Sequence, residues 1–420
     1  MSLLLPAVAL AGWPADPVSW EVDQGTEVVF VEDHRVPLVE VRVWFPVGSW
    51  SPWFAENGGA EAFEIQLYDE DSALRQRADE LAASFSFHVD PYSSNLAVRC
   101  LKEDLPEVLE LLDEVLDNTS FSPDELKRMG QNRKIAWQSS NKDFMFKLEQ
   151  GVLFSLFAEG DVRRSDYEEP AKVVKDDLTL LSTRSTLVRM PGRLIGFGGD
   201  LTRDDVEELA ADLLPTVVSP DPSLTLEPVY LAPNTERTSS EVTLPGLTQT
   251  YFGYHREGIT WQDPSFPAWL VADHVLGGHF FSRLYVALRH DDGDTYGAGT
   301  RGDPWHVPLA YGAWTFTRAE NQASTEQKLV ETVSTLAAEG ITQQELDEAV
   351  SSLRGEQLLG SQSPGQVLDR ALWEKVHDLP EGFRSYQIER AGELSLEEVN
   401  AFASDFYAPE HWTMLRLVAE

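Results

Sequence analysis

The sequence predicts an α+β protein made of two homologous domains of about 200 residues each, which arose by internal duplication. Three observations support this fold class. Patterns typical of strands and helices recur in one order in the two halves of the 420-residue chain. A strand-like run at 412–418 matches a similar run at 194–197 in the first half. Residues 215–233 are rich in Pro, Ser and Thr and lack a helical period, which is typical of a linker.

The first half begins with strands and continues mainly as helices. Alternating apolar residues predict its strands, at 27–32, 36–46, 85–89, 95–101 and 193–200. Apolar residues three and four apart predict its helices, at 73–83, 103–116 and, as long segments, from 122 to about 181. Ser122, with Pro123 and Glu125 behind it, and Thr202 are favoured at helix N-termini, so each marks the start of a helix.

The second half repeats this order of elements. Its predicted strands lie at 249–255, 294–300, 309–318 and 412–418. Its predicted helices lie at 264–276, 326–338, 342–359 and 366–376, and Ser395 caps one more before the last strand. We therefore expect one domain at 20–215 and another at 234–420, joined by a linker at 216–233.

The N-terminus has features of an export signal. Residues 3–10 fit a shortened apolar core, and Ala9-Leu10-Ala11 fits a signal-peptidase site, although the basic leader is missing. We expect residues 1–19 to be the remnant of an export signal or a disordered segment. The protein is then expected to be periplasmic or secreted, with the cytoplasm as the alternative.

The composition excludes several classes of function. The formal net charge is −37, from 70 Asp and Glu against 33 Lys and Arg, and such a field repels nucleic acid and anionic lipid. No run of about 18 apolar residues is present, so we expect no membrane span. The single cysteine, Cys100, excludes an intramolecular disulfide and a multi-Cys zinc site. Its place in an alternating run predicts a buried apolar thiol.

Two carboxylates lie three residues apart where a strand-like run gives way to a helix. The segment 57–66 opens this helix, and it contains Glu61 and Glu64. Side chains three apart share one helix face, so the pair could bind a hard cation or act in acid–base chemistry. The alternative is a solvated pair at a helix start, where negative charge is favourable.

A second constellation lies in the second half. Gly277 and Gly278 would let a backbone loop approach a ligand closely, and Arg289 and Tyr296 bracket a turn. A cation and a phenol that converge there would suit a carbonyl oxygen or a peptide carboxylate, while a structural role is the alternative. The sequence contains no P-loop, no GxGxxG, no GxSxG, and no HExxH or HxxEH among its nine histidines.

Together these residues resemble the pitrilysin/insulinase family of zinc peptidases, specifically its bacterial half-length members related to the mitochondrial processing peptidase. The family's zinc helix, Gly-x-Ala-His-x-x-Glu-His, lies over residues 58–65. At the two His ligand positions this chain has Glu61 and Ile65, while Glu64 keeps the place of the general base. The third ligand position falls near Ala136, within an acid-free stretch. The resemblance implies that this chain binds no zinc, so Glu64 is a relic without a metal-bound water to deprotonate.

The second half keeps the family's other motif. Its pattern of Leu-Gly-Gly, Ser-Arg-Leu, Leu-Arg and a later Tyr matches residues 276–278, 282–284, Leu288-Arg289 and Tyr296. In active members this Arg and Tyr reach across to the zinc domain and hold the substrate. The resemblance implies that Arg289, Tyr296, Gly277 and Gly278 bind substrate. It also implies two α/β-sandwich domains that pair with a second subunit like a clamshell.

The leading hypothesis is a non-catalytic subunit that acts with a zinc-bearing homologue on a peptide or unfolded polypeptide. This chain would bind no cofactor, and zinc would be held by the partner. A second hypothesis is a peptidase-like scaffold without a catalytic partner, comparable to the core subunits of respiratory complex III. A third is an enzyme that uses Glu61 and Glu64 with another metal.

Overall fold

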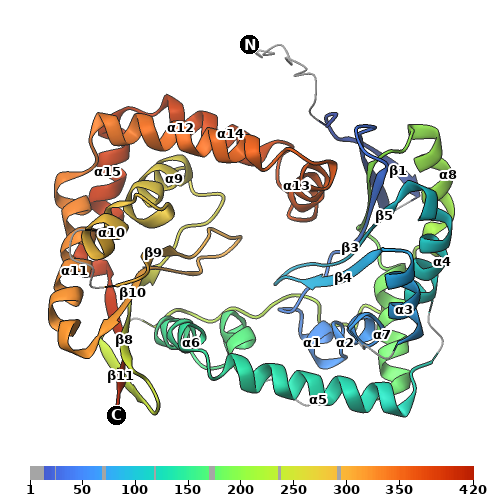
Figure 1. Ribbon diagram of the computed structural model, residues 1–420, viewed down its shortest axis with the longest axis horizontal. Helices are drawn as coiled ribbons and strands as arrows, with labels where there is room; N and C mark the ends of the chain where they lie inside the picture. Colours follow the sequence, from blue (N-terminus) through green and yellow to red (C-terminus); the bar gives the residue numbers. More distant parts are fainter. Residues whose placement is uncertain are drawn as a thin grey trace. The chain divides into compact units, whose positions relative to one another are not determined.

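The computed structural model contains two compact units, each with one β-sheet and helices packed on it (Figure 1). It describes residues 14–23, 25–68, 72–117, 120–169, 176–234, 238–290 and 295–420. Unit 1 consists of residues 1–135, 171–228 and 357–383, and unit 2 consists of residues 136–170, 229–356 and 384–420. The predicted export signal lies largely outside the described residues, and its last two residues, 18 and 19, belong to the first strand.

The sheet of unit 1 has six strands in the order β1-β2-β6-β3-β5-β4. Strands β2 and β6 are parallel, and the other neighbours are antiparallel. The strands are β1 (Val18–Asp23), β2 (Thr26–Glu32), β3 (Leu38–Phe45), β4 (Ser84–Val89), β5 (Ser94–Leu101) and β6 (Arg193–Gly199).

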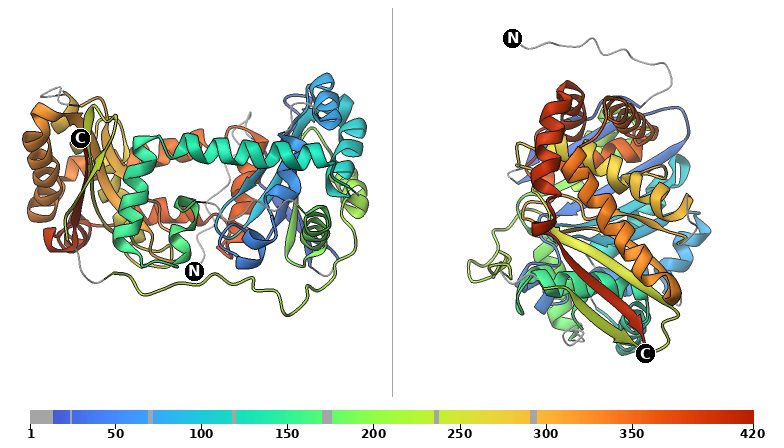
Figure 2. Two further views of the ribbon diagram at one scale, coloured as in Figure 1. Left: turned by 90° about the horizontal axis from the view of Figure 1, so that it is seen from below. Right: turned by 90° about the vertical axis from the view of Figure 1, so that its left-hand side faces the viewer.

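The sheet of unit 2 has five strands in the order β7-β11-β8-β10-β9. The C-terminal strand β11 lies between β7, to which it is parallel, and β8, to which it is antiparallel (Figure 2, right). The strands are β7 (Ser240–Leu244), β8 (Gln249–Glu257), β9 (Ala298–Arg301), β10 (Ala310–Arg318) and β11 (Thr413–Ala419).

The two sheets share one topology. The series β2-β6-β3-β5-β4 in unit 1 and β7-β11-β8-β10-β9 in unit 2 have the same order and the same pattern of parallel and antiparallel neighbours. Strands β6 and β11, whose sequences were matched above, take equivalent places. The predicted α+β duplication is therefore confirmed at the level of topology.

The helices follow the predicted order with shifted ends. The stretch 57–66 forms a turn and then α2, whereas the helical region predicted to end near 181 continues in α7 to Arg189. The helices of the first half are α1 (Pro52–Glu56), α2 (Glu61–Leu67), α3 (Ala73–Glu80), η1 (Lys102–Asp104), α4 (Leu105–Leu116), α5 (Pro123–Ser140), α6 (Phe144–Leu156), η2 (Val162–Tyr167), α7 (Asp177–Arg189) and α8 (Arg203–Leu213).

In the second half, the predicted helix 264–276 is an α-helix that continues as a π-helical turn, α9 and η3. Capping boxes at Thr202 and Ser395 confirm two predicted helix starts. The helices are α9 (Phe266–Asp273), η3 (His274–Gly278), α10 (Arg283–Tyr285), η4 (Val286–His290), η5 (Ala319–Asn321), α11 (Gln322–Glu339), α12 (Gln343–Leu359), α13 (Pro364–Val376), α14 (Phe383–Glu393), α15 (Leu396–Phe406) and η6 (Pro409–His411).

Each unit contains a helix from the opposite half of the sequence. Helix α13 packs on β2, β3 and β6 of unit 1, and α6 packs on β8, β10 and β11 of unit 2 (Figure 1). The units are therefore not the contiguous ranges 20–215 and 234–420. The chain passes from one unit to the other within α5 and within α12.

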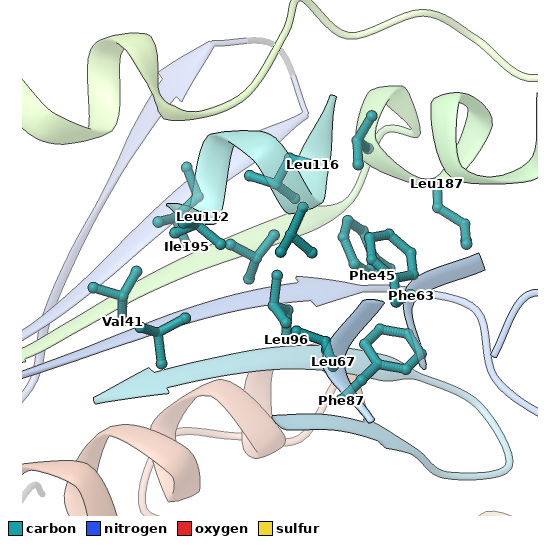
Figure 3. Close-up of a cluster of buried hydrophobic side chains, with 14 of the residues drawn as sticks. Val41, Phe45, Phe63, Leu67, Phe87, Leu96, Leu112, Leu116, Leu187 and Ile195 are labelled. Carbon is teal, nitrogen blue, oxygen red and sulfur yellow. The ribbon is translucent and has the colours of Figure 1, made fainter. Parts of the chain in front are cut away.

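The core of unit 1 lies between its sheet and helices α2, α4 and α7 (Figure 3). Phe63 of α2 stacks on Phe45 and on Phe87, with ring centroids 5.5 and 4.7 Å apart. This stacking holds α2 against the sheet. Cys100 of β5 is buried in the same core, and burial raises the pKa of its thiol to about 12. The predicted inert, buried cysteine is confirmed.

Among the described residues, no helix has both the length and the apolar character needed to cross a membrane. The predicted linker, 216–233, contains no helix or strand, apart from a single bridge between Pro233 and Phe157.

Candidate functional site

Helix α2 carries the residues predicted to lie at the degenerate zinc positions, and two glycines set its start. Gly58 has a φ of 73°, in the region that favours glycine. A Cβ at Gly59 would lie 2.3 Å from the buried ring of Phe54. The Gly-Gly sequence before Glu61 is thus required by a tight turn over Phe54.

The side chains of α2 face two environments. Ile65 is 2% exposed and belongs to the hydrophobic core. Glu61 and Glu64 meet Arg133 of α5: Glu61 Oε1 is 3.4 Å from Nη1, and Nη2 donates a 2.7 Å hydrogen bond to Glu64 Oε2. One guanidinium therefore bridges both carboxylates.

Burial governs the charges of this group. Burial raises the pKa of Glu61, and the positive charge of Arg133 opposes that rise. Burial acts to lower the pKa of Arg133, but the carboxylates of Glu64 and Glu61 outweigh it, so this pKa is raised. The guanidinium stays charged and acts as the counter-ion of the pair.

The group does not fit a zinc ion. Zinc requires lone-pair donors, and a guanidinium offers only N–H donors and a positive charge. Ala136, the predicted third position, follows Arg133 by three residues on α5 and has a methyl side chain. The described residues contain no group of three or more His, Cys, Asp or Glu that could hold a metal ion.

The second constellation lies in unit 2, where the glycines make close contacts within the chain. The π-helical turn η3 ends at Gly278. A Cβ at Gly277 would lie 2.3 Å from the backbone nitrogen of Thr300 in β9, and one at Gly278 would lie 3.0 Å from Asp273 Oδ2. The structure thus gives both residues a packing reason to be glycine.

Arg289 and Tyr296 are both accessible but are not joined by a described contact. The guanidinium carbon of Arg289 lies 4.9 Å from the ring centroid of Tyr285 and 5.5 Å from that of Phe280. Tyr296 is 76% exposed. Residues 291–294 between them lie outside the described part of the chain.

Two arginines that form ion pairs in these regions, Arg133 and Arg283, were not among the predicted site residues. Arg133 lies one helical turn before the third ligand position, but Lys127, Arg128 and Lys134 on the same helix give it no distinguishing sequence signal. Arg283 makes two 2.7 Å hydrogen bonds to Glu345 and a 2.9 Å bond to the carbonyl of Gly340. The arginine of the Ser-Arg-Leu motif thus forms an ion pair with Glu345 of α12.

Comparisons with known proteins agree with this geometry. Residues 195–353 match the family model described as the peptidase M16 inactive domain. The non-peptidase homolog YmxG of Helicobacter pylori is 23% identical over 391 residues, covering 91% of this chain and 89% of that protein. These similarities point to the inactive members of the peptidase M16 family. This is the pitrilysin/insulinase family that the motifs had indicated.

Further M16 relatives support the assignment. Subunit 1 of the human mitochondrial cytochrome b-c1 complex is 25% identical over 327 residues, covering 73% of this chain and 61% of that protein. The crystal structure of an M16 inactive domain from Pseudomonas fluorescens has a TM-score of 0.79 at 22% identity and covers 97% of this chain and 98% of its own. A protease from Helicobacter pylori has a TM-score of 0.80 at 15% identity, with coverages of 97% and 100%. These structures show the two-domain α+β fold.

Proposed function

We propose that this M16 chain is the zinc-less subunit of a heteromeric metallopeptidase and positions substrate through Arg289 and Tyr296. The observation that carries the proposal is the bridge from Arg133 to Glu61 and Glu64. It holds the relic base in an ion pair at the place where active relatives bind zinc. Hydrolysis would then need a zinc-bearing homologue, paired with this chain like a clamshell.

The accessible pair gives the chain a role in such an assembly. The guanidinium of Arg289 lies over the rings of Phe280 and Tyr285, and its N–H groups can donate to an oxygen. The exposed phenol of Tyr296 can donate one more hydrogen bond. Both groups would stabilise negative charge on a peptide carbonyl oxygen, while zinc in the partner would activate the water.

The proposal extends to substrate and location. The substrate would be a peptide or an unfolded polypeptide, because a folded protein rarely presents its backbone for such contacts. The signal-like N-terminal sequence supports a periplasmic or secreted location.

Reconstitution with a zinc-bearing homologue tests the proposal. We expect little peptidase activity from either chain alone and a large increase in kcat/KM when they are mixed. Arg289→Ala and Tyr296→Phe should each lower kcat/KM of the mixture by about 100-fold, the usual effect of losing an oxyanion donor. Arg318→Ala is the matched control, because Arg318 is an exposed arginine of unit 2 that pairs with the equally exposed Glu320. Equal rates with and without this chain would refute the proposal.

A scaffold without a catalytic partner is the second candidate. It is favoured by the similarity to proteins described as a non-peptidase homolog and as a subunit of the cytochrome b-c1 complex. Affinity purification from the native organism separates the two functions. Recovery of a stable complex that lacks any zinc-bearing homologue would favour the scaffold.

An enzyme that uses Glu61 and Glu64 with another metal is opposed by the Arg133 bridge. A divalent cation at these carboxylates would have to displace the guanidinium. A stoichiometric amount of bound metal in the purified chain would support this third hypothesis.

A further inference from the structure

A pocket of about 860 Å³ in unit 2 lies between the segment η3–α10–η4 and the helices α11 and α12. Arg289, Tyr296 and the two glycines do not line it. Its walls combine apolar side chains, among them Val275, Val286 and Ala349, with histidines and carboxylates. The pocket is therefore chemically distinct from the Arg/Tyr pair.

Two stacked imidazoles line the pocket. The rings of His274 and His279 are parallel within 4°, with centroids 4.3 Å apart. His279 Nδ1 lies 2.7 Å from the carbonyl oxygen of His274, which can only accept, so Nδ1 is the donor of this hydrogen bond. His274 is 4% exposed, and its ring nitrogens have no hydrogen-bond partner in the described part of the chain.

The imidazole of His274 thus lies at the pocket wall with no ring hydrogen bond from the described residues. Burial, together with the neighbouring His279, lowers the pKa of His274 to about 4, so the ring is neutral at pH 7. The stacking argues against a shared metal ion. Imidazole lone pairs lie in the ring plane, and two parallel rings direct them along parallel lines that do not converge on one ion.

Carboxylates supply the charge of the pocket. Glu331 of α11 and Glu348 of α12 each accept a hydrogen bond from a glutamine amide, Gln327 at 2.6 Å and Gln344 at 2.8 Å. Neither forms an ion pair with a described residue. The cation of Arg283 is neutralised by Glu345.

The remaining cation, Lys328, has an interaction of its own. Three carboxylates, Glu331, Glu345 and Glu348, and two cations, Arg283 and Lys328, line the pocket, so these side chains sum to a charge of −1 and leave a surplus of acceptors.

We propose that this pocket binds a guanidinium group, carried either by an arginine of a polypeptide or by a free small molecule. A guanidinium offers five donors in one plane, enough for two carboxylates and an imidazole nitrogen at once, whereas an ammonium offers three. The apolar wall suits the methylene stem. Phe281, 74% exposed and part of the lining, offers a ring face to the cation. The proposal goes beyond the Arg/Tyr function and does not depend on it.

Isothermal titration calorimetry on the full chain tests the proposal with Nα-acetyl-L-arginine amide. The citrulline amide has nearly the same shape without the charge, so we expect it to bind about tenfold more weakly or worse. The double variant Glu331→Gln, Glu348→Gln should weaken arginine-amide binding to a similar extent, and His274→Phe should weaken it less.

Asp347→Asn is the matched control. Asp347 accepts an amide hydrogen bond from Gln343 at 2.9 Å, as Glu348 does from Gln344, but it does not line the pocket. This variant should bind the arginine amide like the wild type.

Comparison of agmatine with an arginine-containing pentapeptide identifies the source of the group: tighter binding of the peptide indicates a polypeptide, and equal or tighter binding of agmatine indicates a small molecule. Equal affinity for the citrulline amide, full binding by the double variant, or no binding of any guanidinium would overturn the proposal. The experiment needs no partner subunit, so its failure is distinguishable from failure of the peptidase function.

Discussion

Arg133 supplies the degenerate zinc helix with a positive charge of its own. Zinc would neutralise carboxylates by direct coordination, whereas the guanidinium does so with one hydrogen bond of 2.7 Å and one longer ion pair of 3.4 Å. Glu61 is only 8% exposed, so its charge depends on that neighbour. A side-chain cation thus compensates the buried negative charge at this place in the fold.

Replacing Arg133 by Met should therefore destabilise the fold. The methylene stem is kept, but the buried carboxylate of Glu61 loses its counter-ion, which costs about 3 kcal/mol of unfolding free energy. Without Arg133 the pKa of Glu61 rises further above its unfolded value, so protonation relieves the variant and its deficit shrinks as the pH falls through that raised pKa. Urea titrations at several pH values measure this. Lys134→Met, an exposed neighbour on α5, should have little effect, and an unchanged midpoint for Arg133→Met would contradict the counter-ion role.

We expect the titration of His274 to lower the free energy of unfolding as the pH falls. Its pKa is about 4 in the folded chain and about 6.5 when unfolded. Between these values the unfolded chain binds more protons, so the free energy of unfolding decreases as the pH falls, by at most about 3 kcal/mol. The difference between wild type and His274→Phe, measured by thermal melts from pH 7.5 to 4, isolates this contribution from that of the carboxylates. Parallel curves across the range would show that His274 does not titrate in this way.

At this scale the sequence located the carboxylates but not their partner. Glu61 and Glu64 were placed on one helix face by their spacing alone. Arg133 lies 69 residues beyond Glu64, and no local pattern determines which face of α5 meets α2. The pairing of Arg289 with Phe280 and Tyr285 was missed for a different reason. The turn of the chain within 280–289 depends on π-helical geometry that periodicity does not reveal.

At the scale of elements, each sheet has a glycine where the helix from the opposite half of the sequence packs closely against it. A Cβ at Gly196 of β6 would lie 2.5 Å from Leu372 Cδ1 and 3.0 Å from Leu368 Cδ1 of α13. A Cβ at Gly253 of β8 would lie 3.0 Å from Val152 Cγ2 of α6. Gly196 and Gly253 lie on strands that are not equivalent in the two repeats, β6 and β8, so the same packing solution occurs at different places in the shared topology.

Gly196→Val should loosen the contact of α13 with its sheet. The added side chain overpacks a buried interface, and we expect a loss of about 2 kcal/mol in unfolding free energy. Hydrogen exchange should show weaker protection of the amides of α13 than in the wild type. Gly355→Ala in α12 is a control of opposite sign, because nothing lies within 4 Å of the new methyl and alanine favours helix by about 1 kcal/mol. Unchanged protection in α13 would argue that Gly196 is not required for its packing.

The exchange itself could not be derived from sequence. Periodicity identified the helices of 122–181 and 366–376 and the order of the strands, which sufficed for the duplication. An apolar helix face shows that a helix is buried but not which sheet covers it. The simplest prediction therefore assigned each helix to the sheet of its own half of the sequence. Helices α6 and α13 instead pack on the sheet formed by the other half.

At the scale of the whole molecule, the two repeats have kept one topology and diverged in chemistry. In the first repeat, Glu61 pairs with Arg133 and Ile65 lies in the core, and the second repeat contains Arg289 and Tyr296. Over the whole chain acids outnumber bases by about two to one, 70 Asp and Glu against 33 Lys and Arg. Since many of these acids are exposed, their mutual repulsion acts on the folded chain as a whole.

That repulsion predicts a stability that rises with salt. The screening length falls from about 30 Å at 0.01 M to about 3 Å at 1 M salt, so added NaCl should relieve repulsion between exposed carboxylates. We expect the midpoint of thermal unfolding to rise by about 5 °C between roughly 0.01 M and 0.5 M NaCl at pH 7.5. Choline chloride should act equally, because screening depends on ionic strength and not on the cation, while sucrose at equal osmolality controls for solvent exclusion. A midpoint that falls with salt would contradict this prediction. It would mean that ion pairs, such as Arg133 with its two glutamates, stabilise the fold by more free energy than the repulsion between carboxylates destabilises it.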